Sequence, residues 1–439
     1  MPVRLYPSAL VAGAWLVAAC GSGAASPDGG ARADAAVTDG GPGPADGGTY
    51  TLGVPPECQA AADKGLAWLV AQQRSDGSWG RLGRAGGPMY TVATTAFAVL
   101  KLETHAQESH LLPFDPAYPY RDQVAKGLDY LLSQTLVVPI TPQVAGNPDT
   151  DGDGKGVGFQ SPASVWMYET AIALMAIVAG RYPTRVVETA GSQVSGWTYR
   201  QVAQAVVDYL AFAQSDDVGA AGVICQRGGW RYEALDHDAD GDNSSSQFVA
   251  LALEYAVHPQ YGFACTVPDF VRVELSHWLD CVQIGDGGGN QGGSGYLSNS
   301  DAPNVYKTGA LIQEAAFVGD WILSPRIQAA LGFLARHWAD PPGPDDQSQV
   351  GWQGTPANYL AMYAIMKGLE SVGATDVQGI DWYREFCDVL TLQQDPAGFW
   401  PPSTYDQVFQ PDPAAPGSGL LATEWALLTL ERAAPPPME

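Results

Sequence analysis

Near the start of the chain stands the motif Lys64-Gly65-Leu66-Ala67-Trp68-Leu69-Val70-Ala71-Gln72-Gln73-Arg74-Ser75-Asp76-Gly77-Ser78-Trp79. It joins an apolar helix that ends in Gln to a turn that holds Gly and Trp, and a second apolar helix follows. Weaker copies of this unit begin near positions 126, 205, 278, 330 and 390. Because a recurring unit of this kind is typical of helical repeat proteins, the sequence predicts six turns and twelve helices.

The two helices of each unit differ in their apolar surface. The first has an apolar stripe with polar gaps, as in residues 63–74, so it covers a core on one face only. The second is apolar almost all round, as in residues 165–178, so it should be buried on most sides. Such pairs either stack into an open superhelix or curl until the ends meet. Six pairs between a tether and a short tail favour closure into a ring.

The Gln and Gly-x-Trp pattern resembles the QW repeat of squalene cyclases and prenyltransferases. The resemblance covers nearly all of residues 56–433, with further turns at Gly228-Gly229-Trp230, Gly351-Trp352 and Gly398-Phe399-Trp400. It implies an all-α fold, an α6/α6 toroid in which the first turns of the inner helices face a central cavity.

The N-terminal segment predicts export. Residues 1–20 contain Arg4 and an apolar run too short for a retained membrane span. The end of this segment, residues 16–20, resembles a bacterial lipobox, which implies acylation of Cys20, and Gly21 implies an outer-membrane destination. The alternative is an ordinary signal peptide in which Cys20 is incidental. Residues 21–55, rich in Gly, Ala, Asp and Pro, are expected to form a flexible tether, and residues 434–439 a tail.

The net charge limits the kinds of partner that the protein can bind, and the cysteine count limits its disulfides. The net charge of -25 argues against nucleic acid, which requires clustered Lys and Arg, and nothing in the sequence indicates a nucleotide cofactor. Five cysteines follow Cys20, and an odd number leaves at least one thiol free unless it pairs between chains. Cys225 and Cys281 both follow or close outer helices on the same rim, so we expect them to form a disulfide.

Two acidic loops share one pattern. Asp149, Asp151 and Asp153 alternate before a Gly, as do Asp236, Asp238 and Asp240. This spacing matches the start of an EF-hand-like Ca²⁺ loop, in which oxygen ligands converge on one cation. The twelfth position carries Gln160 or Gln247 in place of the usual Glu. Two solvated acidic turns are the alternative, and a bound calcium ion would fix loop geometry rather than perform chemistry.

The ring predicts a pocket at the heads of the inner helices. Ser, Thr and Asn there are explained by helix capping. Capping does not explain the charged, amide and aromatic side chains at these heads, which we expect to line the pocket. They are Tyr168, Glu169, Gln247, Tyr306, Lys307, Tyr363, Glu424 and Trp425.

Binding is the function that these features favour, with an apolar small molecule or lipid, a glycan or a protein partner as ligand. The alternative is an exported enzyme, a hydrolase or lyase that cleaves polysaccharide, with Glu169 and Glu424 as paired carboxylates and Lys307 as their electrostatic partner. A terpenoid cyclase is disfavoured because the Asp-x-Asp-Asp motif of squalene-type cyclases is missing. A prenyltransferase needs zinc, and His277 with Cys281 is better explained as a surface His and a packed Cys.

Overall fold

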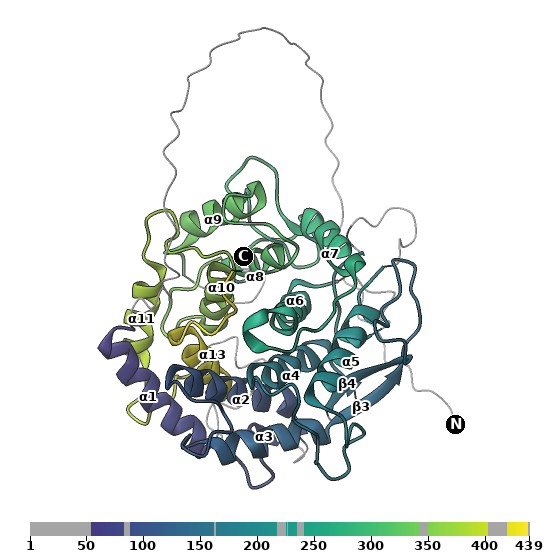
Figure 1. The fold of residues 1–439 in the computed structure, drawn as a ribbon. Coiled ribbons are helices and arrows are strands. Elements are labelled where there is room, and N and C mark those ends of the chain that lie inside the picture. The colour runs from purple at the N-terminus through teal and green to yellow at the C-terminus, as the bar shows by residue number, and fades with distance from the viewer. Residues whose placement is uncertain are drawn as a thin grey trace, which may run out of the picture. The chain divides into compact units, whose positions relative to one another are not determined.

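The computed structural model describes residues 54–82, 88–161, 164–216, 225, 227–234, 241–341, 350–402 and 419–437. In these ranges twelve helices form two concentric layers (Figure 1). The outer layer consists of α1 (Pro56–Ala71), α3 (Arg121–Ser133), α5 (Tyr199–Phe212), α7 (Asp269–Val282), α9 (Pro325–His337) and α11 (Trp382–Gln393). The inner layer consists of α2 (Thr91–Glu108), α4 (Met167–Ala179), α6 (Asn243–Val257), α8 (Val305–Phe317), α10 (Tyr359–Ser371) and α13 (Leu420–Leu430).

The inner helices form a closed ring. Each packs against the next in chain order, and α13 packs against both α10 and α2. The outer layer closes as well, because α1 contacts α11. The predicted α/α toroid of six helix pairs is therefore confirmed. No helix in the described ranges combines the length and the apolar character that a membrane crossing requires.

At four junctions in the described ranges, the Gln of the repeat joins one outer helix to the next. Gln394 shows the arrangement: its Nε2 donates to the Gly398 carbonyl of its own turn at 2.9 Å and to the Ala61 carbonyl of α1 at 2.8 Å. Three further junctions repeat it, from Gln73 to the Gln123 carbonyl, from Gln214 to Val271 and from Gln283 to Arg326. Because the last Gln reaches α1, the repeat motif itself closes the ring.

The Trp and Gly of the turn are fixed by equally specific contacts. Trp400 Nε1 donates to the Leu390 carbonyl at 2.8 Å, so the buried indole N–H is satisfied by the preceding outer helix. Gly228 has a φ of +95°, and a Cβ there would lie 1.9 Å from the Glu274 carbonyl oxygen of α7. Only glycine fits where a left-handed turn meets the backbone of the next outer helix so closely.

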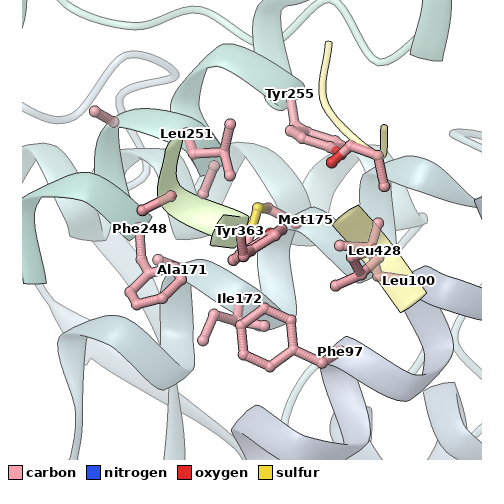
Figure 2. Close-up of a cluster of buried hydrophobic side chains, with 14 of the residues drawn as sticks. Phe97, Leu100, Ala171, Ile172, Met175, Phe248, Leu251, Tyr255, Tyr363 and Leu428 are labelled. Carbon is pink, nitrogen blue, oxygen red and sulfur yellow. The ribbon is translucent and has the colours of Figure 1, made fainter. Parts of the chain in front are cut away.

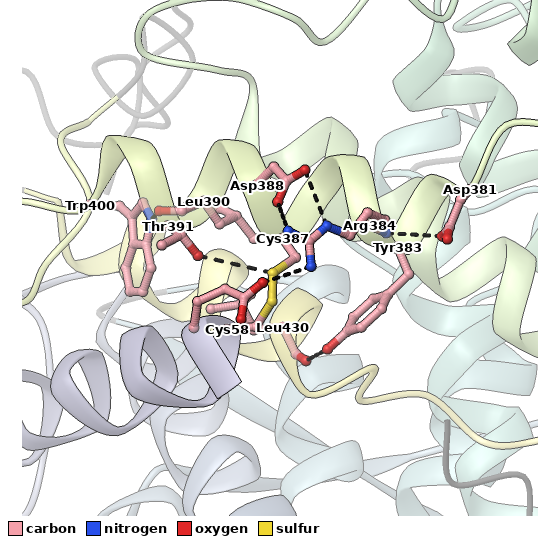
Figure 3. Close-up of a disulfide and its surroundings, with 11 residues drawn as sticks. Cys58, Asp381, Tyr383, Arg384, Cys387, Asp388, Leu390, Thr391, Trp400 and Leu430 are labelled. Atoms are coloured by element: carbon pink, nitrogen blue, oxygen red, sulfur yellow. Dashed lines mark hydrogen bonds and ion pairs between the residues drawn. A yellow bond between two sulfur atoms is a disulfide. The ribbon is translucent and has the colours of Figure 1, made fainter. Parts of the chain in front are cut away.

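Two disulfides are present in the described residues. Cys225 and Cys281, the pair suggested by the sequence, are joined with their Cα atoms 5.5 Å apart. Cys58 and Cys387, which the sequence did not pair, join α1 to α11 with a Cα separation of 5.7 Å (Figure 3). Cys265 is buried and has no disulfide partner in these ranges.

The second helix pair, α3 and α4, departs from the all-helical pattern because strands lie between its two helices. After α3 the chain forms β3 (Thr135–Pro139), which pairs in antiparallel fashion with β4 (Lys155–Ser161), and β5 (Ser164–Val165) follows. The β-branched run in β3 favours a strand over a helix. The sheet packs on α5, where Gly156 and Gly158 lie close to the Tyr209 side chain. A second, two-residue ribbon joins β1 (Arg81–Leu82) to β2 (Pro88–Met89), and η1 (Pro259–Tyr261) is a short 3-10 turn.

The middle of the ring is filled by side chains. Phe97 of α2 contacts Phe248 of α6 and Tyr363 of α10, with ring centroids 5.9 Å apart in both pairs (Figure 2). Because α2, α6 and α10 are alternate inner helices, these three rings converge on the centre. At the C-terminal ends of the inner helices, Tyr255 Oη donates to the Ala433 carbonyl at 3.5 Å, so the tail crosses that end. The N-terminal heads of the inner helices lie at the opposite end.

Candidate functional site

Five half-buried aromatic side chains form a continuous strip over the heads of α2, α4 and α6. Tyr90 lies 6.2 Å from Tyr168, measured between ring centroids, and Tyr168 lies 6.3 Å from Trp166. Trp166 lies 6.4 Å from Tyr232, whose hydroxyl is 2.9 Å from the hydroxyl of Tyr296. We call these five residues the rim strip.

Backbone contacts hold the rim strip in place. Tyr90 and Trp166 are the residues that precede α2 and α4, so both helix starts position a ring. The Tyr232 carbonyl accepts from Met167 N at 2.8 Å, and the Tyr296 carbonyl accepts from Asn243 N at 3.1 Å. Tyr90 adopts a φ of +50°, a left-handed conformation that is uncommon for an aromatic residue and that clusters at ligand sites when it occurs.

Arg231 lies against the strip and is charge-compensated there. Its guanidinium carbon is 4.5 Å from the Tyr232 centroid and 6.0 Å from that of Tyr296. A nitrogen of the same group is 3.1 Å from Asp242, whose other oxygen accepts from Ser245 N at 2.7 Å and caps α6. Burial raises the pKa of Asp242, while the Ser244 hydroxyl, the Ser245 N–H and Arg231 lower it. Arg231 is therefore held in one orientation with its charge paired.

Glu169 has a capping role that the sequence analysis did not assign to it. This fully buried carboxylate accepts from Ala93 N, in the first turn of α2, at 3.1 Å. Tyr90 gives α2 no side-chain cap, so α4 supplies one from outside the helix. Burial raises the pKa of Glu169 to about 7, against the lowering effect of the N–H groups and Ser161.

The three candidate catalytic residues come from alternate inner helices. Glu169 lies on α4, Lys307 on α8 and Glu424 on α13, and no two of these helices are neighbours in the ring. Lys307 Nζ donates to the Ala302 carbonyl at 2.6 Å. Glu424 is fully buried, and the neighbouring Trp425 is 3% exposed.

Other predicted lining residues meet a lysine that the sequence analysis missed. Gln247 donates from Nε2 to the Tyr306 hydroxyl and accepts from Lys367 Nζ at 3.2 Å. The Lys367 ammonium group lies 4.6 Å from the Phe248 centroid and 4.7 Å from that of Tyr363. Burial lowers the pKa of Lys367 to about 7, although Glu314 and Glu254 act to raise it. A lysine within the otherwise apolar residues 359–369 was the available signal.

The first acidic loop joins β3 to β4. Ligand oxygens of Asp149, Asp151 and Asp153 lie within 4.8 Å of one another, and the group could hold a metal ion. The Asp149 carboxylate accepts from Gly152 N at 2.8 Å and from Gly154 N at 3.0 Å, which shapes the loop. The second predicted loop, with Asp236, Asp238 and Asp240, lies outside the described residues, as does Cys20.

No protein-family model matches this chain. No curated protein matches it either. Among solved structures, the GH76A α-1,6-mannanase of Salegentibacter sp. HEL1_6 matches 86% of this chain and 98% of its own, with a TM-score of 0.51 and 12% identity. The type II terpene cyclase MstE of Scytonema matches 86% of this chain and 98% of its own, with a TM-score of 0.49 and 15% identity. At 12% identity, the similarity to the mannanase shows the toroid fold alone.

Proposed function

We propose that this ring binds a carbohydrate chain on the rim strip. The observation that supports the proposal is the continuous row of Tyr90, Tyr168, Trp166, Tyr232 and Tyr296, all half-buried, across three helix heads. Such rings offer an apolar face to the C–H surface of a sugar, and their polar edges offer hydrogen bonds to its hydroxyl groups. Arg231, held by Asp242, adds a fixed donor beside the row.

The packed centre favours a glycan over a deeply buried apolar ligand. Phe97, Phe248 and Tyr363 occupy the place where a long hydrocarbon chain would have to enter the described ring. A sugar chain needs only the open surface of the strip. One protein with this fold, the Salegentibacter mannanase, has been seen with α-1,6-mannotriose, and the proposal does not extend that linkage to this chain.

We propose binding without cleavage. Glu169 is used to cap α2, Lys307 donates to the Ala302 carbonyl, and Glu424 is fully buried. Hydrolysis of a glycosidic bond requires two carboxyl groups on either side of that bond. Beside a sugar bound on the rim strip there would be aromatic rings and Arg231, whose charge is paired with Asp242, and not two carboxyl groups on either side of the bond.

Replacing Trp166 by alanine should weaken glycan binding about tenfold, because aromatic residues at the centre of an interface carry much of its free energy. The measurement is affinity electrophoresis of the intact chain in gels that contain different neutral polysaccharides. Thermal unfolding of the variant, followed by circular dichroism, would show that the ring is still folded.

The matched control is Trp321→Ala. Trp321 is 60% exposed and follows α8, at the end of the ring opposite the helix heads, so its loss should leave binding unchanged. Equal retardation of wild type and Trp166→Ala would contradict the proposal, as would no retardation in any gel. Release of new reducing ends from a retained polysaccharide would show that the protein is a hydrolase and not a binding protein.

We also propose that the protein is exported, that Cys20 carries a lipid anchor and that Asp149, Asp151 and Asp153 hold a calcium ion. Two disulfides suit an oxidising compartment outside the cytoplasm. Carboxylate oxygens within 4.8 Å of one another suit a hard cation, and calcium is bound by flexible oxygen ligands of this kind.

One native mass spectrometry experiment on the full chain, extracted from membranes of the expressing bacterium, tests both the anchor and the calcium ion. We expect a chain that lacks residues 1–19 and carries acyl groups at its first cysteine. We expect the Asp151→Asn/Asp153→Asn variant to bind one calcium ion fewer than wild type, since it loses two charged ligands. An unmodified Cys20 would disprove the anchor. Identical calcium stoichiometry in both proteins would disprove this metal site.

A further inference from the structure

One end of the ring gathers most of the exposed apolar side chains. At this end the inner helices finish and the outer helices begin, and we call it the base. Of the seven large apolar side chains that are exposed in the described ranges, five lie at the base. They are Leu112, Val186, Val273, Trp321 and Leu323. Single apolar residues scattered over a surface need no explanation, but their concentration at one end marks an interaction surface.

The first cluster lies in the α8–α9 connection. Trp321 and Leu323 are 60% and 61% exposed, while Ile322 between them packs against the core. The loop is fixed, because Trp321 N donates to the Ser324 hydroxyl at 3.0 Å and Ser324 N donates to the Trp321 carbonyl at 2.7 Å. Two large apolar side chains are therefore held outward by a loop that has its own hydrogen bonds.

Val273 of α7 belongs to the same cluster. Arg326, in the first turn of α9, is paired with Asp320 of the α8–α9 loop. The same guanidinium lies 2.6 Å from Asp280 and 3.4 Å from the Ser276 hydroxyl, both on α7. Val273 stands three residues before Ser276, on the same face of α7, and is 56% exposed. The arginine thus joins the loop to α7, and it neutralises the only carboxylate of residues 318–324.

A second cluster lies between the α2–α3 and α4–α5 connections. Phe114 and Tyr182 pack edge to face with ring centroids 4.9 Å apart, and the exposed Leu112 and Val186 are close to them in the chain. The guanidinium carbon of Arg185 is 4.1 Å from the Phe114 centroid. Among the ion pairs of the described residues, none includes Arg185. It therefore places a positive charge beside apolar side chains, which suits a phosphate group next to acyl chains.

A neutral span separates the two clusters. The connections follow the order of the helices around the ring, so the α6–α7 connection lies between them. Its residues 258–268 contain no Asp, Glu, Lys or Arg, in a chain that has 47 acidic residues. On the other side of the ring the α10–α11 connection carries Asp376 and Asp381. The half of the base that carries the apolar clusters is therefore also the half with the less acidic connection.

The start of α1 is the reason to choose a membrane as the partner of this surface. Glu57, in the first turn of α1, pairs with Arg384 of α11. The neighbouring Tyr383 donates to the carbonyl of Leu430, where α13 ends. The described chain therefore enters the ring at the base, and Cys20, the proposed site of lipid attachment, precedes its first residue by 34 positions. A tether of that length raises the concentration of the base at the lipid surface, so that weak apolar contacts become populated.

We infer that the base of the ring docks on a phospholipid bilayer, with Val273, Trp321 and Leu323 among the headgroups and Arg185 beside a lipid phosphate. The choice of a bilayer rests on the proposed lipid anchor. Tryptophan suits this place because its ring is apolar and its N–H group is polar. The rim strip lies at the opposite end of the inner helices, so docking turns it away from the membrane and towards glycans in solution.

The test is quenching of tryptophan fluorescence by brominated lipid. The full chain is extracted from membranes and reconstituted into vesicles of phosphatidylethanolamine and phosphatidylcholine, with bromine on the phosphatidylcholine acyl chains in one sample only. These lipids are zwitterionic because the net charge of -25 would oppose binding to an anionic surface. The contribution of Trp321 is the difference between wild type and Trp321→Phe. We expect the brominated lipid to quench about half or more of it, because docked interfacial residues reach the acyl boundary.

Two exposed leucines supply the matched variants. Leu323→Asp places a carboxylate in the first cluster and should abolish the quenching of Trp321. Leu392→Asp makes the same change at the opposite end of the ring, near the end of α11, where the side chain is 84% exposed, and should leave the quenching unchanged. Both leucines are largely exposed, so both variants should unfold at the same temperature as wild type. Equal quenching of Trp321 in the two variants would overturn the inference.

The anchor and the docking surface can fail separately. A chain that floats with the vesicles but whose Trp321 is not quenched has the anchor and overturns the inference. A chain that does not float lacks the anchor, and it is then held on vesicles that contain a nickel-chelating lipid through six histidines inserted after Gly21. Quenching of Trp321 there would support docking without the anchor, and its absence would overturn the inference. A dimer that Leu323→Asp dissociates, with no quenching in wild type, would assign the surface to a second copy of the chain.

Discussion

Replacing both Cys58 and Cys387 by alanine should cost the protein several kcal/mol of unfolding free energy, the largest loss that we expect from removing any one crosslink. The disulfide joins the first and last outer helices across 329 residues of sequence. The chain-entropy relation gives an upper value of about 6 kcal/mol for a loop of this length. The midpoint of urea unfolding under oxidising conditions measures the effect.

The Cys225→Ala/Cys281→Ala variant is the matched control, because it removes a disulfide that closes only 56 residues. The same relation gives about 4 kcal/mol for that loop, so the ring-closing bond should be worth more. Hydrogen exchange should also accelerate in α1 of the first variant and not in α7, since α1 is then held to α11 only by contacts such as Arg384 with Glu57. Equal losses in the two variants would mean that ring closure does not depend on this bond.

The ring could be predicted from sequence because its repeat motif makes short, stereotyped contacts. A Gln, a Gly and a Trp within a few residues specify the turn, and one bond from the Gln specifies the next outer helix. The β3–β4 hairpin lies between α3 and α4 and replaces the Gln link there. The Gln134 side chain donates to the hydroxyl of Ser133, while its backbone carbonyl accepts from Gln160 N of β4. An insertion of this kind follows its own β-branched pattern and gives no repeat signal.

The candidate site was predicted only in part, for a geometric reason. Aligning the inner helices by their apolar runs found Tyr168 of the rim strip, and it found Gln247 and Tyr306, which contact each other. Tyr232 and Tyr296 lie in turns before α6 and α8, outside any aligned helix, so their positions depend on how the turns fold. The Cys58 to Cys387 disulfide was missed for a similar reason, since pairing it requires the register in which the ring closes.

Replacing Glu254 by glutamine should stabilise the protein at pH 8 by up to about 3 kcal/mol. Glu254 on α6 is 2% exposed, and its Oε2 accepts from Gln313 Nε2 at 3.0 Å and from the Ser371 hydroxyl at 3.3 Å. Burial raises the pKa of Glu254 to about 7, although these two hydrogen bonds lower it. Glutamine keeps an acceptor for both donors, and its new N–H₂ group can donate to Gln313 Oε1, a buried acceptor without a partner in the described residues.

The sign of the pH dependence follows from proton binding. The folded state holds the Glu254 proton more tightly than the unfolded chain, in which the pKa of Glu254 is 4.5. The protonated carboxyl group therefore contributes stability that is fully present below pH 4.5 and is lost as the pH rises through 7. Wild type and Glu254→Gln should therefore unfold at similar urea concentrations at pH 4.5 and diverge by pH 8. Lys367 titrates in the opposite sense, because burial lowers its pKa to about 7 and stability from it rises with pH above 7. Because the Glu254 charge also raises the pKa of Lys367, the difference between the two proteins at each pH contains the loss of that interaction as well.

Glu274→Gln is the control for loss of a buried carboxylate as such. Glu274 on α7 is 3% exposed, like Glu254, but it is paired with Arg227. Breaking that pair leaves the arginine without its anion, so this variant should be less stable than wild type at pH 8, where Glu254→Gln is more stable. The opposite signs arise because Glu274 faces a cation and Glu254 faces only neutral donors at hydrogen-bonding distance. If both variants lose stability at pH 8, Glu254 is ionised and stabilised in the folded ring, and its environment must be more polar than the helices around it indicate.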